Sequence, residues 1–303
     1  MTDEDATRDA WLLDTHQHLV FPSRFRYSWT DSVPALKDRA FTPADYWRLA
    51  DPGGIRAALF METGVDDPFW QDETRHLVKL AADPANRIAG IVAGCRPEDD
   101  PERFDQWLEE LADAPVAGFR RILHTEPDEL STSAAFARNV RELGRRGKSF
   151  DLCFLERQLP LAVELAAQCD GTTLVLDHCG VPDIAGGRPE SWRRHIRELA
   201  RMPHVCCKIS GVVAYCPPGV TLEPAIRPYV EYCVEQFGPD RLVWGSDWPV
   251  CNITSGVADW TAMFRRLVAS ESPDTQRAIF RDNALRLYGV DGHRIAAPRT
   301  ADA

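Results

Sequence analysis

Hydrophobic positions in this chain form short apolar runs that alternate with longer amphipathic stretches. The apolar runs predict eight β-strands, at residues 11–16, 55–61, 88–94, 116–123, 150–155, 173–178, 204–210 and 241–246. The amphipathic stretches predict helices at residues 73–82, 101–112, 132–145, 159–168, 192–200, 224–237, 257–269 and 275–287. Near-continuous apolar strands that alternate with helices are typical of a parallel sheet covered by helices.

The number of strand–helix units favours a closed barrel over an open, doubly wound sheet. The units follow one another without a glycine-rich phosphate loop, and 303 residues suit one barrel, which takes about 250 residues before insertions. We therefore predict the α/β class, as a single-domain (β/α)8 TIM barrel over residues 11–290. A disordered tail at residues 1–10 and a C-terminal tail at residues 291–303 would flank it.

An irregular stretch at residues 20–41, rich in aromatic side chains, follows the first predicted strand. A loop of this length inside a compact domain is usually functional. In a barrel it would lie over the carboxyl ends of the strands, where barrel enzymes carry their active sites.

Composition narrows the classes of partner. The net charge of −11 leaves no basic face for nucleic acid or for an anionic membrane surface. No stretch reaches the roughly 18 apolar residues of a membrane span, and the acidic N-terminus lacks an apolar signal core. The nine cysteines include no Cys-x-x-Cys pair, which indicates reduced packing residues. We expect a cytoplasmic enzyme that acts on small molecules. Assembly into a homo-oligomer is compatible with the sequence.

The candidate chemistry begins with a His-x-His motif at the end of the first strand. His16 and His18 share one face there, because side chains along a strand alternate with period two. Asp247 follows the last strand and can meet the two imidazoles only if the sheet curls shut. Together they indicate a hydrolytic or metal site at the mouth of a closed barrel.

The strands between these two end in further polar side chains. They are Glu62, Arg120, His124, Glu156, Asp177, His178 and Lys208. Arg120 and His124 share one face of the fourth strand if that strand has no bulge. So many polar groups at the ends of apolar strands are costly unless they line a wet pocket.

Five blocks carry a resemblance to a known family: DTHQH (14–18), GFRRI (118–122), LDHCG (176–180), KISG (208–211) and RLVWGSDWP (241–249). In this order, spanning about residues 12–288, they resemble the amidohydrolase superfamily and its branch of sugar-lactone and aromatic-pathway lactonases. The resemblance implies a hydrolase of the ester-bond class that opens a lactone of a sugar acid or an aromatic catabolite, as in carbohydrate catabolism.

The resemblance also implies a ligand set. The superfamily's usual metal ligands are the His-x-His pair, a histidine on strand five, often one on strand six, and the strand-eight aspartate. His16, His18, His178 and Asp247 match it, whereas residues 150–156 contain no histidine and Arg120 stands where a bridging lysine would. At most one divalent ion, zinc or manganese, is therefore expected on His16, His18 and Asp247, with Glu62 or His178 as a further ligand. A metal-free site remains an alternative.

The expected roles follow from lactone hydrolysis. Asp247 is the candidate general base for water, and His178 or an ion would polarise the carbonyl. The candidate substrate contacts are Arg120, His124, Lys208 and Trp248. Structural roles compete with these: a helix cap for Asp247, ion pairs inside the barrel mouth for Arg120 and Lys208, and packing for Trp248.

Two other functions remain as alternatives on the same scaffold. One is a non-oxidative decarboxylase or an amide or carbon–carbon hydrolase, which the missing strand-five histidine disfavours. The other is an inactive barrel that serves as a binding module, which the charged strand ends disfavour.

Overall fold

The computed structural model describes residues 11–292 and 295, and it contains one parallel sheet of eight strands. Each strand pairs with its neighbour in sequence, in the order β1 to β8. The strands are β1 (Leu12–Gln17), β2 (Ile55–Met61), β3 (Ile88–Gly94), β4 (Val116–Ile122), β5 (Ser149–Cys153), β6 (Leu174–Leu176), β7 (Val205–Ile209) and β8 (Leu242–Trp244). This topology confirms the predicted (β/α)8 barrel.

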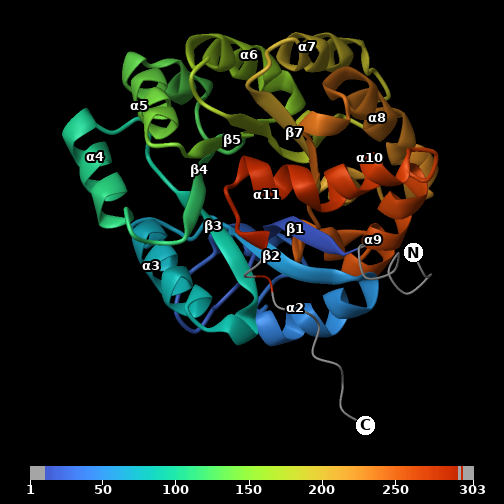
Figure 1. The fold of residues 1–303 in the computed structure, drawn as a ribbon, viewed down its shortest axis with the longest axis horizontal. Helices are drawn as coiled ribbons and strands as arrows, with labels where there is room; N and C mark the ends of the chain where they lie inside the picture. Colours follow the sequence, from blue (N-terminus) through green and yellow to red (C-terminus); the bar gives the residue numbers. More distant parts are fainter. Residues whose placement is uncertain (1–10, 293–294, 296–303) are drawn as a thin grey trace.

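Helices surround the strands as an outer ring (Figure 1). The α-helices of the described residues are α2 (Pro43–Ala50), α3 (Trp70–Ala81), α4 (Pro101–Glu110), α5 (Ala134–Arg145), α6 (Leu159–Gln168), α7 (Glu190–Ala200), α8 (Leu222–Phe237), α9 (Val257–Leu267), α10 (Pro273–Arg277) and α11 (Asn283–Leu287). The large hydrophobic cluster between this ring and the outer face of the strands forms the main core.

The barrel closes between β1 and the segment that follows β8. The amide of Asp247 donates to the carbonyl of His16 at 2.7 Å, and the amide of His18 donates to the carbonyl of Trp248 at 2.7 Å. The Asp14 carboxylate adds a third link, because its Oδ1 accepts from the amide of Ser246 at 2.7 Å. Closure therefore brings the first and last motifs of the chain into direct contact.

A second, smaller core fills the amino-terminal end of the barrel. Ala284 and Tyr288, in and after α11, pack there against Leu13, Val92 and Val243 from the strands. In Figure 1, α11 lies across the near end of the barrel. The functional side chains consequently face the opposite, carboxyl-terminal end.

Strands β6 and β8 stop earlier than predicted. The predicted strand over residues 173–178 ends at Leu176, because His178 and Cys179 have φ angles of 54° and 56°. The predicted strand over residues 241–246 ends at Trp244, after which the chain turns to bond with β1. Left-handed backbone cannot continue a strand, so β6 ends in a turn that redirects the side chains of His178 and Cys179.

Two helices also differ from the prediction. The helix α2 was not predicted, although Thr42 and Asp45 form a capping box in which each side chain accepts the other's amide proton. The helix predicted over residues 275–287 is present as one continuous helical segment from α10 to α11, but it contains an unpredicted π-helical turn at Ala278–Asp282. That turn keeps Ile279 and Phe280 buried.

The predicted irregular segment at residues 20–41 lies over the carboxyl end of β2. Val20 and Phe41 pair as an antiparallel bridge that closes its base. Within it, Nε1 of Trp29 donates to the carbonyl of Thr63 at 3.0 Å. The segment is thereby fastened beside the predicted site.

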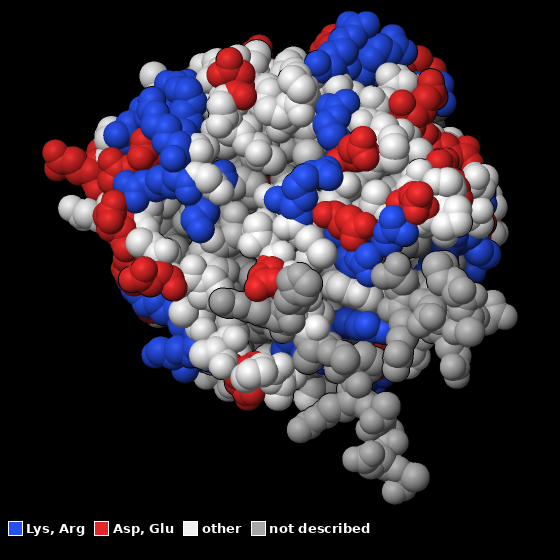
Figure 2. Space-filling model, in the orientation of Figure 1, with Lys and Arg blue, Asp and Glu red and all other residues white. Residues whose placement is uncertain are grey.

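Charged side chains of both signs are spread over the surface. On the face shown in Figure 2, the basic and acidic side chains are interspersed. Among the described residues, no helix is both long and apolar enough to span a bilayer. The tail predicted at residues 1–10 and most of the one at residues 291–303 lie outside the described residues.

Candidate active site

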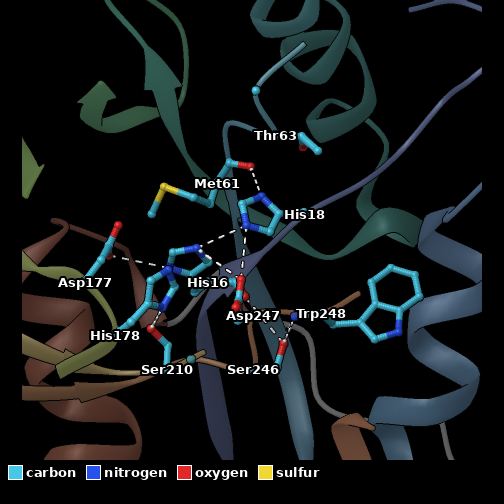
Figure 3. Close-up of polar contacts among 12 residues, drawn as sticks. His16, His18, Met61, Thr63, Asp177, His178, Ser210, Ser246, Asp247 and Trp248 are labelled. Atoms are coloured by element: carbon cyan, nitrogen blue, oxygen red, sulfur yellow. Dashed lines mark hydrogen bonds and ion pairs between the residues drawn. The ribbon is translucent and has the colours of Figure 1, made fainter. Parts of the chain in front are cut away.

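Two imidazoles and one carboxylate meet at the carboxyl end of the barrel (Figure 3). Nε2 of His16 lies 3.2 Å from Nε2 of His18. Oδ1 of Asp247 lies 3.6 Å from the first of these nitrogens and 3.3 Å from the second. The structure thus brings together the His-x-His pair and the distant aspartate that the sequence singled out.

His178 completes this group from the turn after β6. Its ring centroid lies 4.7 Å from that of His16. His178 and Asp247 both have left-handed backbone, with φ angles of 54° and 57°. Such conformations cost a non-glycine residue about 1–3 kcal/mol and concentrate at functional sites. The fold therefore holds both side chains in place at an energetic cost.

Each histidine of the cluster has a polar partner at Nδ1. Nδ1 of His18 lies 2.9 Å from the carbonyl of Met61, and Nδ1 of His178 lies 2.9 Å from the Ser210 hydroxyl. Nδ1 of His16 lies 3.5 Å from Asp177. Partners of this kind fix the ring orientation. Nε2 of His16 and Nε2 of His18 both face Asp247. Burial lowers the pKa values of His16 and His178, which favours their neutral forms.

Arg120 is enclosed by carboxylates beside the cluster. Its Nε donates to Glu62 at 3.1 Å and its Nη1 to Asp177 at 3.1 Å. Nη1 also lies 3.3 Å from Nε2 of His16. The second carboxylate oxygen of Glu62 accepts the amide of Gly64 at 3.1 Å. These two predicted site residues form an internal ion pair at the edge of the cluster.

Lys208 extends this group of ion pairs towards the interior of the barrel. Its ammonium group is fully buried and contacts Asp151 and Asp177, the latter at 3.2 Å. The Tyr288 hydroxyl lies 3.4 Å from Asp151. Burial would raise the pKa of Asp177, but Lys208 and His16 outweigh it and hold this pKa well below its ordinary value. Burial raises the pKa of Asp151 to about 7 despite Lys208.

The other predicted substrate contacts lie in two different environments. Trp248 is 1% exposed and packs against Phe41 and Tyr46, at ring distances of 5.4 and 5.3 Å. In Figure 3 its indole points away from the histidines. His124 lies at the end of β4, with Nδ1 3.5 Å from the Cys153 sulfur. Of the two, His124 is the one that faces the site.

Possible ligands for a metal ion are His16, His178 and Asp247, which each offer one atom within 4.8 Å of the others. His18 lies against two of them. Glu62 does not join this set, because Arg120 and Gly64 occupy its oxygens. Asp247 is not the cap of the following helix, α9, whose N-cap is Gly256.

Gly211 is a site residue that the reading of strand ends missed. It follows β7, has a φ of 56°, and a Cβ there would lie 2.3 Å from Nδ1 of His178 and 2.6 Å from Oδ2 of Asp247. Its position in the sequence could have identified it, because Ser210 and Gly211 directly follow the strand that carries Lys208 and so lie at the carboxyl end of the barrel. Tyr215, whose ring lies 6.0 Å from that of His178, was also missed.

We expect Gly211→Ala to reduce kcat/KM at least about 100-fold, because the methyl group must displace His178 or Asp247. The matched control is Gly219→Ala, since Gly219 has a φ of 83° and open space around it. It carries the same backbone penalty without the crowding, so it should retain activity. Equal losses in the two variants would contradict the role of crowding.

His124 gives a prediction for the dependence of stability on pH. Burial, with Arg120 nearby, lowers its pKa from 6.5 to about 4. The unfolded chain therefore binds a proton at His124 between pH 6.5 and 4, whereas the folded chain does not. Relative to a His124→Gln variant, the wild-type free energy of unfolding should be constant above pH 6.5. Below it, the difference should fall by about 1.4 kcal/mol per pH unit. Urea unfolding at pH 7.5 and 5 measures it, and a pH-independent difference would refute it.

Comparison with known proteins places this geometry in a family. The family model described as Amidohydrolase matches residues 13–290. The chain belongs to the amidohydrolase family. This amidohydrolase is 32% identical to the L-fucono-1,5-lactonase of Burkholderia multivorans over 308 residues, which cover 97% of the chain and 99% of the relative.

Two more comparisons extend this result. The 4-sulfomuconolactone hydrolase of Rhizobium radiobacter is 26% identical over 93% of this chain and 91% of that protein. A crystal structure of a Burkholderia multivorans amidohydrolase with bound zinc has a TM-score of 0.83 and 31% identity, covering 93% of this chain and all of that one. These findings confirm the resemblance to the lactonase branch.

This amidohydrolase departs from the usual ligand set at one strand. Its β5 has no histidine, as the sequence indicated, and Asp151 on that strand pairs with Lys208 instead. Asp151, the β5 residue that faces the barrel interior, thus belongs to the buried ion pairs of Lys208, together with Asp177.

Proposed function

We propose that this amidohydrolase opens a sugar-acid lactone by attack of water. The observation that carries the proposal is the convergence of His16, His18, His178 and Asp247 at the barrel mouth. Its support is the similarity to L-fucono-1,5-lactonase over almost the full length of both chains.

The same residues fit one divalent cation. In the described part of the chain, the ion-pair partners of Asp247 are histidines, so no arginine or lysine neutralises this buried carboxylate. His16 and His18 present Nε2 to it. The Nδ1 atoms of His18, His178 and His16 contact a carbonyl, a hydroxyl and a carboxylate. Zinc, which a solved relative binds, takes such nitrogen and oxygen ligands. When bound, the ion would polarise the lactone carbonyl and make water more acidic.

Asp247 acts as the general base in the proposed mechanism. It accepts a proton from water as the water oxygen bonds to the carbonyl carbon. The ring carbon–oxygen bond then breaks, and the same proton returns from Asp247 to the leaving alkoxide, which gives a hydroxy acid. His178, held by Ser210, lies beside the developing oxyanion. Arg120 and Lys208 keep Asp177 ionised and so orient His16.

A panel of lactones tests this proposal by proton release. We expect turnover of L-fucono-1,5-lactone and related sugar lactones, with weaker activity on 4-sulfomuconolactone. Aromatic carboxylic acids, assayed for carbon dioxide release, serve as the control for a decarboxylase. Dialysis against a chelator should lower the rate at least about tenfold, and zinc should restore it. Carbon dioxide release without lactone opening would overturn the assignment.

The location and assembly stay predictions. The nine free thiols support a reducing, cytoplasmic compartment. Measurement of the molar mass in solution tests whether the protein forms a homo-oligomer.

A further inference from the structure

Three cysteine side chains meet in a part of the fold that the catalytic site does not use. Cys179 follows β6, Cys207 lies on β7 and Cys233 lies on α8. All three are fully buried, and their sulfur atoms lie within 4.8 Å of one another. The cluster therefore joins three separate elements.

The local fold explains why these sulfurs converge. Lys208 points into the barrel, so its neighbour Cys207 points outwards to the helices. On α8, Cys233 follows Ile226 and Val230 in the buried stripe that faces the barrel. Left-handed backbone at Cys179, whose carbonyl accepts Nε1 of Trp192 at 2.8 Å, turns the third sulfur outwards as well. Cys179 thus packs in the main core, behind the catalytic site.

The dimensions of the cluster suit one ion bound by three sulfurs. Metal–sulfur bonds of about 2.3 Å in a flat, three-coordinate site place the sulfurs about 4.0 Å apart. The observed limit of 4.8 Å requires a contraction of less than about 1 Å. Packing alone needs small apolar side chains, and it does not require that three thiols share one centre.

The number of ligands selects the ion. Among the described residues, no fourth histidine, cysteine or carboxylate joins this group. Structural zinc takes four ligands, whereas the soft ion Cu(I) favours thiolates and accepts three.

We propose that Cys179, Cys207 and Cys233 form a binding site for one Cu(I) ion, separate from the catalytic group. On binding, the three S–H bonds break, their protons leave to solvent, and each thiolate sulfur bonds to copper. No electron is transferred.

Anaerobic transfer of Cu(I) from its bicinchoninate complex to the reduced full-length protein tests this site. We expect the wild type to take up one equivalent slowly, because the cluster is buried, and copper X-ray absorption to show three sulfur neighbours. Cys233→Ala should bind at least tenfold more weakly. The control Cys169→Ala removes a buried thiol that contacts the carbonyl of Ala137, outside the cluster, and should bind as the wild type does.

Three results would overturn the proposal. They are equal copper uptake by wild type and Cys233→Ala, nitrogen or oxygen neighbours around the copper, and zinc binding at the thiols as tight as that of Cu(I). If Cys233→Ala loses its folded circular dichroism spectrum, the isosteric Cys233→Ser replaces it in the same comparison.

Discussion

Asp247→Asn should lower kcat/KM for the preferred lactone at least about 1,000-fold while the protein stays folded. An amide cannot accept the proton of the attacking water, and general-base catalysis contributes about 10²–10⁴-fold. The same change removes the negative charge that His16 and His18 face at 3.6 and 3.3 Å. Any bound divalent ion should therefore be held more weakly. Steady-state kinetics with a pH indicator and elemental analysis of the purified protein measure both effects.

Asp183→Asn is the matched control for this variant. Asp183 is an exposed carboxylate in the segment that follows β6, where it accepts the amide of Gly186. Its amide variant changes the net charge equally and should keep wild-type kinetics. If Asp247→Asn retained more than a tenth of the wild-type activity, the general base would have to be another residue.

Lys208→Met should lower the free energy of unfolding by about 3–5 kcal/mol at pH 7.5. Removal of one member of a buried ion pair leaves the other charge uncompensated, here on Asp151 and in part on Asp177. Arg120 still contacts Asp177, so Asp151 carries most of the cost. Urea unfolding with an unchanged m-value measures the difference.

The dependence of this loss on pH separates it from a loss of packing. Burial raises the pKa of Asp151 to about 7, and without Lys208 this pKa rises further. A carboxyl group with a raised folded-state pKa destabilises the fold increasingly as pH rises. The deficit of Lys208→Met should therefore shrink from pH 7.5 to pH 5. The double variant with Asp151→Asn should recover at least half of it at pH 7.5, and no recovery would point to packing.

The fold was predictable because its pattern is local and repeated. Strands such as β2 and β3 are apolar runs bounded by polar segments, and their predicted limits agree with the structure. Errors arose where the backbone leaves regular geometry. The turn at His178 and Cys179 accepts a hydrogen bond from Trp192 on α7, and the π-helical turn at Ala278–Asp282 buries Ile279 and Phe280. Hydrophobic periodicity carries no information about either.

The candidate site also has one part that the sequence predicts and another that only the tertiary structure shows. Strand parity places His16 and His18 on one face, and that expectation needs no tertiary information. Which charges neutralise one another does need it. Arg120 and Lys208 looked like substrate contacts, and the structure encloses both among carboxylates from other strands. An ion pair between β5 and β7 depends on the barrel's curvature, which no single segment encodes.

The sequence by itself determined the barrel, its lactonase-like motifs and the four residues that converge at its mouth, because alternation and strand ends are properties of neighbouring residues. The tertiary structure alone decided the rest. It closed β1 against the segment after β8, left Asp247 facing histidines, and placed Gly211 where a methyl group cannot fit. It also gathered three scattered cysteines into one cluster. Each of these contacts joins residues far apart in the chain, so only the closed fold creates it.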